Sequence, residues 1–238
     1  MTSQQVELLR DPPSYRMALS AGWQRLPMEP TAMRTAARSW LLKRYASVSR
    51  DESVRLRRQV EEELVELTRR PGAEYARSLF VLALDVDERP LSASCLVSVV
   101  NHDLSEDRKL SVLAEQESVG AIESTVTDLG ANRGVVTVRD SRVQGPEVAD
   151  PEAVADAAIA VVQAMGVLDE PTEQDRERAK DRWATTRAVD VWLPVPDEPR
   201  CLLLQFSTPL VPLFDALTEL FVVTACTVQW QRPDGSWS

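Results

Sequence analysis

The chain contains one histidine, His102, which lies between Asn101 and Asp103. An imidazole next to a carboxylate can act as a general base that the carboxylate orients. His102 and Asp103 are therefore the candidate catalytic pair of a hydrolase or a transferase. The alternative is an ordinary loop at the end of a strand, which we favour because so short a match arises freely in unrelated sequences.

Carboxylates also cluster at Asp85, Asp87 and Glu88, and oxygen ligands at this spacing could hold a hard cation such as calcium. The EF-hand calcium loop requires a glycine at its sixth position, where this chain has Pro90. A solvated turn is the favoured interpretation. One histidine and dispersed cysteines without a CxxC pair exclude the common zinc and two-histidine iron sites. We therefore expect no metal and no other cofactor.

The hydrophobic pattern places these residues in an α+β fold. Apolar runs separated by turn residues predict two β-hairpins, the first with the acidic cluster at its tip and His102 at its end. Apolar stripes at helical spacing predict the helices. The predicted strands cover 18–26, 75–85, 91–100, 122–129, 134–139, 188–196 and 201–209, and the predicted helices cover 31–47, 50–70, 105–116, 151–165, 172–183 and 210–230.

These elements predict a largely antiparallel sheet flanked by helices, an α/β/α sandwich. An N-terminal helical pair and a helical insertion at about 141–187 elaborate the sandwich. We expect a single domain over 18–230 that includes the insertion, a loosely ordered segment at 1–17 and a tail at 231–238. Ser207 and Thr208 occupy positions where they could cap the terminal helix.

The C-terminal part of this order resembles the Mog1/PsbP-like α/β/α sandwich superfamily. The resemblance lies mostly within 78–230, in the paired strands, Val191-Trp-Leu-Pro-Val-Pro, Leu202-Leu-Leu-Gln-Phe-Ser-Thr-Pro and a terminal helix that runs into Thr227-Val-Gln-Trp230. The likeness is architectural. Members of that superfamily are largely non-catalytic binding or assembly factors, so the resemblance implies a binding role and assigns no individual residue.

The composition limits the partners. A formal net charge of -10 opposes non-specific binding to nucleic acid and to anionic membranes, because such binding needs positive potential. The N-terminal residues lack the apolar core of a secretory signal, and no uncharged stretch long enough to span a bilayer precedes Leu210. Cys95, Cys201 and Cys226 lie in apolar runs, which is typical of buried free thiols. We expect a cytoplasmic protein that binds neither nucleic acid nor membranes.

The predicted helix at 50–70 carries an arginine-rich surface at Arg55, Arg57 and Arg58. Over 50–70 the six arginines are balanced by six acidic residues. Interspersed charges of this kind are typical of a solvated helix face with i,i+4 pairs. We therefore do not expect a phosphate-binding surface there.

The insertion presents the strongest candidate interface. Its predicted helix has an apolar face, which could pack on the protein's own sheet or bind a partner. The expected protein-interaction residues are Val154, Ala158, Val161, Val162 and Met165, with Trp183 and Trp192 as aromatic anchors. The leading hypothesis is a non-enzymatic adaptor or assembly protein that binds another protein or itself, and the acidic composition favours a basic partner. The alternatives are the enzyme that uses His102 and a small-molecule sensor with a cavity between the sheet and the terminal helix.

Overall fold

The computed structural model describes residues 14–44, 50–70, 72–86, 89–142, 185–209, 213–232 and 234–237. The strands are β1 (Tyr15–Arg16), β2 (Trp23–Pro27), β3 (Ala76–Val86), β4 (Arg89–Val100), β5 (Glu123–Leu129), β6 (Asn132–Arg142), β7 (Thr185–Pro194), β8 (Cys201–Thr208) and β9 (Gln229–Trp230). The helices are α1 (Pro30–Arg44), α2 (Arg50–Leu67), α3 (Asp107–Glu117) and α6 (Phe214–Cys226), with a short 3-10 turn at Ala73–Tyr75.

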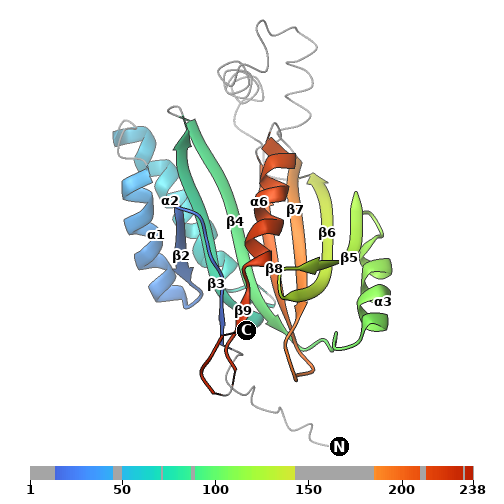
Figure 1. Cartoon of the computed structure of the whole chain (residues 1–238). Helices are drawn as coiled ribbons and strands as arrows, with labels where there is room; N and C mark the ends of the chain where they lie inside the picture. Colours follow the sequence, from blue (N-terminus) through green and yellow to red (C-terminus); the bar gives the residue numbers. More distant parts are fainter. Residues whose placement is uncertain are drawn as a thin grey trace, which may run out of the picture.

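The predicted fold class is confirmed. Seven strands form one antiparallel sheet in the order β2-β3-β4-β8-β7-β6-β5, and β1 pairs with β9 in a separate ribbon. Both predicted hairpins are present as β3–β4 and β5–β6. Helices flank the sheet, with α1 and α2 at the β2 end and α3 at the β5 end (Figure 1).

The main core lies between the sheet and α6. Because successive strand residues point to opposite faces, one alternating set of side chains meets this helix. Cys95, Leu204 and Phe206 from the strands pack in one cluster with Leu217 and Phe221 from α6. The rings of Phe206 and Phe221 are stacked with centroids 4.8 Å apart. These two rings form the centre of the contact between the sheet and α6.

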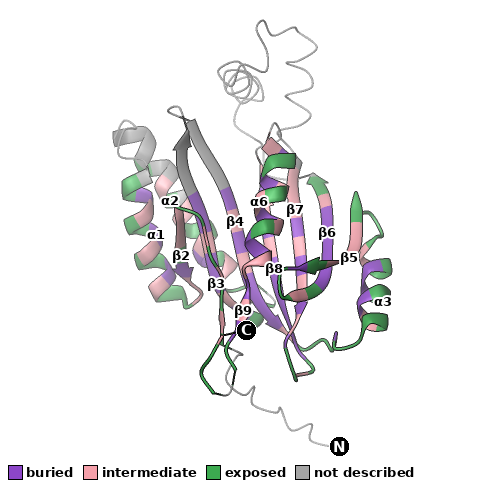
Figure 2. Ribbon diagram, viewed as in Figure 1, coloured by how far each residue is buried: buried purple, intermediate pink, exposed green. Residues whose placement is uncertain are grey.

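The opposite face of the sheet carries two smaller clusters, one at each end. At the β2 end, Met33 of α1 and Val65 of α2 pack against Leu79. At the β5 end, Leu110 and other residues of α3 pack against strands β6 and β8. In Figure 2 the buried residues concentrate on the central strands, whereas α1 and α3 each present one buried and one exposed side. The helices therefore cover the two ends of this face separately.

The turn between β5 and β6 is fixed to the end of α6. Leu129 pairs with Asn132, so the loop has two residues, and Gly130 has a φ of 65°. Positive φ at the first loop position but not at the second, Ala131, defines a type II′ turn. A Cβ at Gly130 would lie 2.3 Å from the backbone oxygen of Cys226. Asn132 also donates from Nδ2 to the carbonyl of Val228 at 2.8 Å.

Several predicted boundaries were wrong. The terminal helix ends at Cys226, and Trp230 belongs to β9, where it pairs with Tyr15. Tyr15 and Arg16 are thus part of a strand, although we expected a loosely ordered segment through 17. Ser207 does not cap the helix, because α6 begins only after Leu213 and the Ser207 Oγ lies 2.7 Å from the Oγ of Ser94.

Most of the expected insertion at 141–187 lies outside the described residues. Only its two ends are described: β6 extends to Arg142, and β7 begins at Thr185. Val154, Ala158, Val161, Val162, Met165 and Trp183 all lie in the range 143–184, which is not described. The resemblance to the Mog1/PsbP-like superfamily stays a prediction. Among the described helices, none is both long and apolar enough to cross a membrane.

Candidate functional site

His102 and Asp103 lie in the loop between β4 and α3, and both are exposed. The Asp103 carboxylate accepts hydrogen bonds from the Ser105 backbone N–H at 3.0 Å, the Ser105 hydroxyl at 2.6 Å and the Lys109 ammonium at 2.6 Å. These donors hold the pKa of Asp103 well below its ordinary value. The carboxylate therefore fixes the loop before α3 and is directed to Ser105 and Lys109, and the structure does not bring the two residues together as a proton-transfer pair.

A shallow hollow of about 510 Å³ lies beside this loop. Asp103 and Ser105 line it together with residues 194–199, the turn between β7 and β8. Two of its three acidic side chains, those of Asp103 and Glu198, already have cationic neighbours in the same chain. Lys109 pairs with Asp103, and the Arg200 Nε donates to Glu198 at 2.6 Å. The hollow thus offers no converging set of carboxylates for a metal, and no metal-binding group of His, Cys, Asp or Glu occurs among the described side chains.

The side chains of the metal alternative, Asp85, Asp87 and Glu88, lie outside the described residues. Asp85 lies in β3, paired with Pro90, but its side chain is outside the described set. Asp87 and Glu88 form the undescribed tip of the same hairpin.

Trp192, one of the expected interface anchors, is half-buried on β7 and packs against the α3-side cluster. Its ring centroid lies 6.2 Å from that of His102. The three cysteines are free; Cys95 and Cys201 are buried, as predicted, whereas Cys226 is only half-buried. Burial raises the pKa of the Cys201 thiol to about 12, which keeps it protonated at neutral pH. None of these groups forms a nucleophile–base pair.

A partly buried ion pair links the sheet to α3. Arg139 of β6 donates from Nη1 to Asp190 of β7 at 2.8 Å and from Nη2 to the backbone carbonyl of Glu117 at 2.8 Å. It also pairs with the Glu117 carboxylate. Burial raises the pKa of Asp190 despite the nearby guanidinium. All three charged groups are engaged with one another, so we assign this network to fixing α3 on the sheet.

A second hollow, of about 520 Å³, lies between α1 and α2. Its position follows from how the two helices are built. Glu29 precedes α1 and accepts from the backbone N–H groups of Thr31 at 2.9 Å and Ala32 at 2.6 Å, which caps the helix. Gly72, with a φ of 89°, allows the chain to turn back after α2. The hollow is lined by Arg34, Arg38, Leu41, Leu42, Val54, Arg57, Arg58, Glu61 and Glu62.

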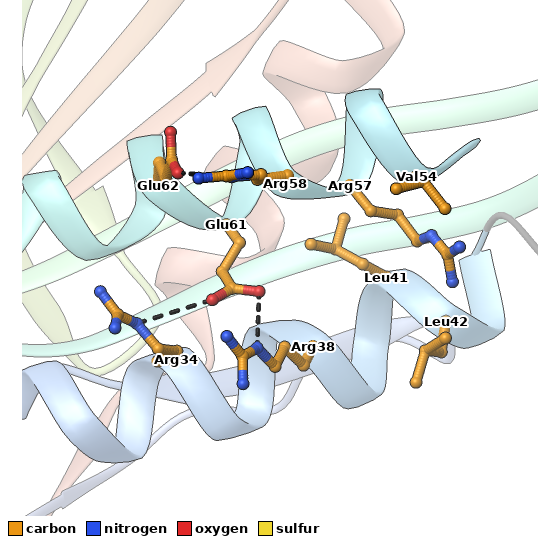
Figure 3. A pocket seen from close by; sticks show the side chains of 9 residues that line it. All are labelled: Arg34, Arg38, Leu41, Leu42, Val54, Arg57, Arg58, Glu61 and Glu62. Atoms are coloured by element: carbon orange, nitrogen blue, oxygen red, sulfur yellow. Dashed lines mark hydrogen bonds and ion pairs between the residues drawn. The ribbon is translucent and has the colours of Figure 1, made fainter. Parts of the chain in front are cut away.

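One glutamate ties the two helices together at the floor of this hollow. Figure 3 shows Glu61 pointing from α2 toward Arg34 and Arg38 on α1. Its carboxylate lies 2.7 Å from the Nε of Arg38 and 3.5 Å from the Nε of Arg34. The Glu61 side chain is only 14% exposed, whereas those of Arg34 and Arg38 are 48% and 63% exposed. The arginines therefore hold the wall in place while their outer N–H groups face solvent.

The open end of the hollow is apolar. Leu41 is buried and forms the base, whereas Leu42 and Val54 are 58% and 52% exposed. Leu42 follows Arg34 by eight residues, which is about 12 Å along a helix. Arginines and exposed aliphatic side chains thus occupy one continuous surface of about two helical turns, which we call the α1–α2 hollow.

The chemistry available in the α1–α2 hollow is recognition. Four arginines face two glutamates, so the lining is cationic although the chain as a whole is acidic. Guanidinium groups donate paired hydrogen bonds to carboxylates, and the exposed Leu42 and Val54 can bury apolar surface. The nine lining residues include no serine, cysteine or histidine that could act as a nucleophile or base. The two carboxylates of the lining, Glu61 and Glu62, are hydrogen-bonded to Arg38 and Arg58.

The sequence did not indicate this site. The arginines of α2 were counted against the acidic residues of their own helix, and the balance predicted a solvated face. Arg34 and Arg38 come from α1, and Arg38 meets Glu61 across 23 residues of sequence. The only signal available was that Arg34, Arg38 and Leu42 repeat at four-residue spacing beside the predicted apolar stripe.

Comparison of the chain with protein-family models, curated proteins and solved structures finds no match.

Proposed function

We propose that the protein is a non-enzymatic protein-binding module of the adaptor or assembly type, and that the α1–α2 hollow is its docking site. The observation that carries the proposal is the joint exposure of arginines and aliphatic side chains on one concave surface. Arginine is enriched at the energetic centres of protein interfaces, and apolar side chains exposed beside it supply buried area on binding.

The partner segment that fits this surface carries both acidic and apolar side chains. Glutamate or aspartate would pair with the guanidinium groups of Arg34, Arg38 and Arg58, which are exposed at their outer N–H groups. Leucine or a similar residue would pack on Leu42 and Val54. The net charge of the chain favours a basic partner elsewhere, but the local lining favours an acidic one here. An amphipathic helix of a few turns matches the length of the hollow.

The location in the cell belongs to the same proposal. Three free cysteines support a cytoplasmic protein, because a reducing compartment keeps thiols unpaired. The enzyme alternative gains no support from the loop geometry, since the Asp103 carboxylate is directed to Ser105 and Lys109.

The experiment compares charge reversals on two helices. The probe is a fluorescently labelled helical peptide in which glutamate-rich turns alternate with leucine-rich turns. Its affinity for the protein is measured by fluorescence anisotropy. We expect Arg38→Glu and Leu42→Asp each to weaken binding about tenfold or more, because a central interface contact contributes about 1–2 kcal/mol or more.

Arg108→Glu on α3 is the matched control, since Arg108 is exposed and carries the same charge change at a distant helix. Equal affinity of Arg38→Glu and Arg108→Glu, with both variants folded, would reject the α1–α2 hollow as the docking site.

A further inference from the structure

The end of the sheet opposite the α1–α2 hollow has a different kind of surface, the outer edge of strand β5. This strand is the last in the sheet and pairs only with β6 among the described strands. A terminal strand has one row of backbone N–H and C=O groups that no neighbouring strand uses, and such an edge can accept another strand.

The turn geometry identifies which groups face outward. In a two-residue hairpin loop the flanking residues, here Leu129 and Asn132, form a hydrogen-bonded pair. Hydrogen-bonded and non-hydrogen-bonded pairs alternate along an antiparallel ladder. The backbone groups of Ser124, Val126 and Asp128 therefore point away from β6, toward the open edge.

The residues of β5 lack the devices that usually protect an edge strand, and α3, which contacts β5, packs on the sheet face through Leu110 and Leu113. Its register with β6 is continuous from Glu123 to Leu129 without a bulge, and it contains no proline, lysine or arginine. The opposite edge strand, β2, is shorter, ends at Pro27 and carries Arg25. Proline and cationic side chains are common devices that block edge pairing. The two edges thus differ in how open they are to a further strand.

The charged and exposed apolar side chains around the β5 edge indicate which kind of segment could bind there. Glu123 and Asp128 lie on the strand and Asp107 lies beside it; Arg133 pairs with Asp107 and Asp128, and Arg108 is exposed on α3. The Asp107 and Asp128 side chains are 75% and 80% exposed.

In the segment between α3 and β5, Val119 and Ile122 are 82% and 58% exposed. A second copy of the chain is disfavoured here, because antiparallel self-pairing would bring two acidic strands together.

We propose that the β5 edge binds an extended segment of another protein that carries basic side chains and at least one apolar residue, by adding it as an eighth strand of the sheet. The backbone of Ser124, Val126 and Asp128 supplies the hydrogen bonds. The carboxylates of Asp107 and Asp128 attract the basic residues, and Ile122 with Val119 contacts the apolar one. This surface is independent of the α1–α2 hollow and lies at the other end of the sheet (Figure 1).

The probe is a peptide of about eight alternating lysine and valine residues, a usual strand length. Its comparison peptide has the same sequence with alternate backbone amides N-methylated, which keeps the charge and removes strand pairing. We expect the unmodified peptide to bind, and to slow hydrogen exchange at the amides of Ser124, Val126 and Asp128. The methylated peptide should bind about tenfold or more weakly, since it loses several backbone hydrogen bonds.

Two variants separate strand addition from charge attraction. Ser124→Pro removes one outward N–H, which an edge strand tolerates, and we expect about tenfold weaker binding. Asp128→Arg should weaken binding by a similar factor, whereas Glu219→Arg, the same change at an exposed position of α6, should leave it unchanged.

Equal binding of the two peptides, no binding, or unchanged exchange at the three amides would overturn the proposal. So would protection of those amides that grows with protein concentration in the absence of peptide, because a second copy would then occupy the edge. Arg38→Glu should not change any of these results, so failure here is distinct from failure at the α1–α2 hollow.

Discussion

The two ends of the sheet present surfaces of opposite charge built from different parts of the chain. At the β2 end, α1 and α2 form a hollow whose recognition groups are side chains, chiefly arginines over a leucine base. At the β5 end, the exposed groups are the backbone N–H and C=O groups of an edge strand, which carboxylates flank. A net charge of -10 hides this division, because it averages over both ends. Partner chemistry is therefore better argued from local surfaces than from composition.

The difference also suits an assembly role. A side-chain surface selects its ligand by charge and shape, whereas a strand edge accepts many sequences through shared backbone hydrogen bonds. A module with one surface of each kind at opposite ends of a rigid sheet can hold two proteins at a fixed separation. A substitution that weakens binding at one surface should then leave binding at the other unchanged.

The largest expected effect tests whether the two ends belong to one cooperative unit. Phe221→Ala removes the ring stacked on Phe206 in the shared core, and we expect the free energy of unfolding to fall by about 3–5 kcal/mol. Urea unfolding followed by hydrogen exchange should show amides of α1 and β5 losing protection at the same denaturant concentration. Separate midpoints for the two helices and the strand would mean that the ends fold independently.

A smaller loss of stability is expected from replacing a glycine of positive φ at either end of the sheet, Gly130 at the β5 end and Gly72 at the β2 end. Gly130→Ala combines a positive φ with a Cβ 2.3 Å from the Cys226 carbonyl, so we expect a loss of about 2–5 kcal/mol. Gly72→Ala has the positive φ but open space around the Cβ, and should cost about 1–2 kcal/mol. Thermal unfolding of both variants checks the order. If Gly72→Ala proved the more costly, the close approach of the β5–β6 turn to α6 would be wrong.

The smallest expected effect comes from removing the carboxylate that precedes a helix at each end of the sheet, Glu29 before α1 and Asp103 before α3. Hydrogen bonds lower the pKa of Asp103, through Ser105 and Lys109, and of Glu29, through the amides of Thr31 and Ala32. A carboxyl group whose folded pKa is lowered stabilises the fold above its unfolded pKa, and this stabilisation is lost as the pH falls through the folded value.

Asp103→Ala and Glu29→Ala should each lower the melting temperature slightly at neutral pH, and the difference from wild type should shrink below about pH 4. Both groups are exposed, so the losses are small. Asp103, with three donors against two for Glu29, should show the larger one. A difference that persists unchanged into acid would show that packing, not ionisation, carries the effect.

Much of the fold could be predicted because its signals are local. The continuous apolar run Leu79-Phe80-Val81-Leu82 predicted a strand of the first hairpin, and the turn residues between the apolar runs predicted both hairpins. Gly72 marked the end of the helical pair. The terminal helix was predicted too long, since its apolar run continues past Cys226 without a break in pattern. Its true end depends on Trp230 pairing with Tyr15, a contact across the whole chain.

The candidate site was less predictable for the same reason. His102 and Asp103 are adjacent in sequence and so attracted a catalytic hypothesis, but the hydrogen bonds of Asp103 go to Ser105 and Lys109. The α1–α2 hollow joins Arg34, Arg38 and Glu61 from two helices, and only the packing of those helices makes them neighbours. Contacts of this kind have no signature in the spacing of one helix.

The most direct test of the docking role uses the methyl groups of the α1–α2 hollow itself. Protein labelled at leucine and valine methyl groups is titrated with the acidic helical peptide and followed by NMR. We expect saturable shifts at Leu42 and Val54 that vanish in Arg38→Glu and persist in Arg108→Glu, with the amides of β5 unmoved. Saturable binding that shifts methyl groups elsewhere, or that survives Arg38→Glu unchanged, would contradict the account.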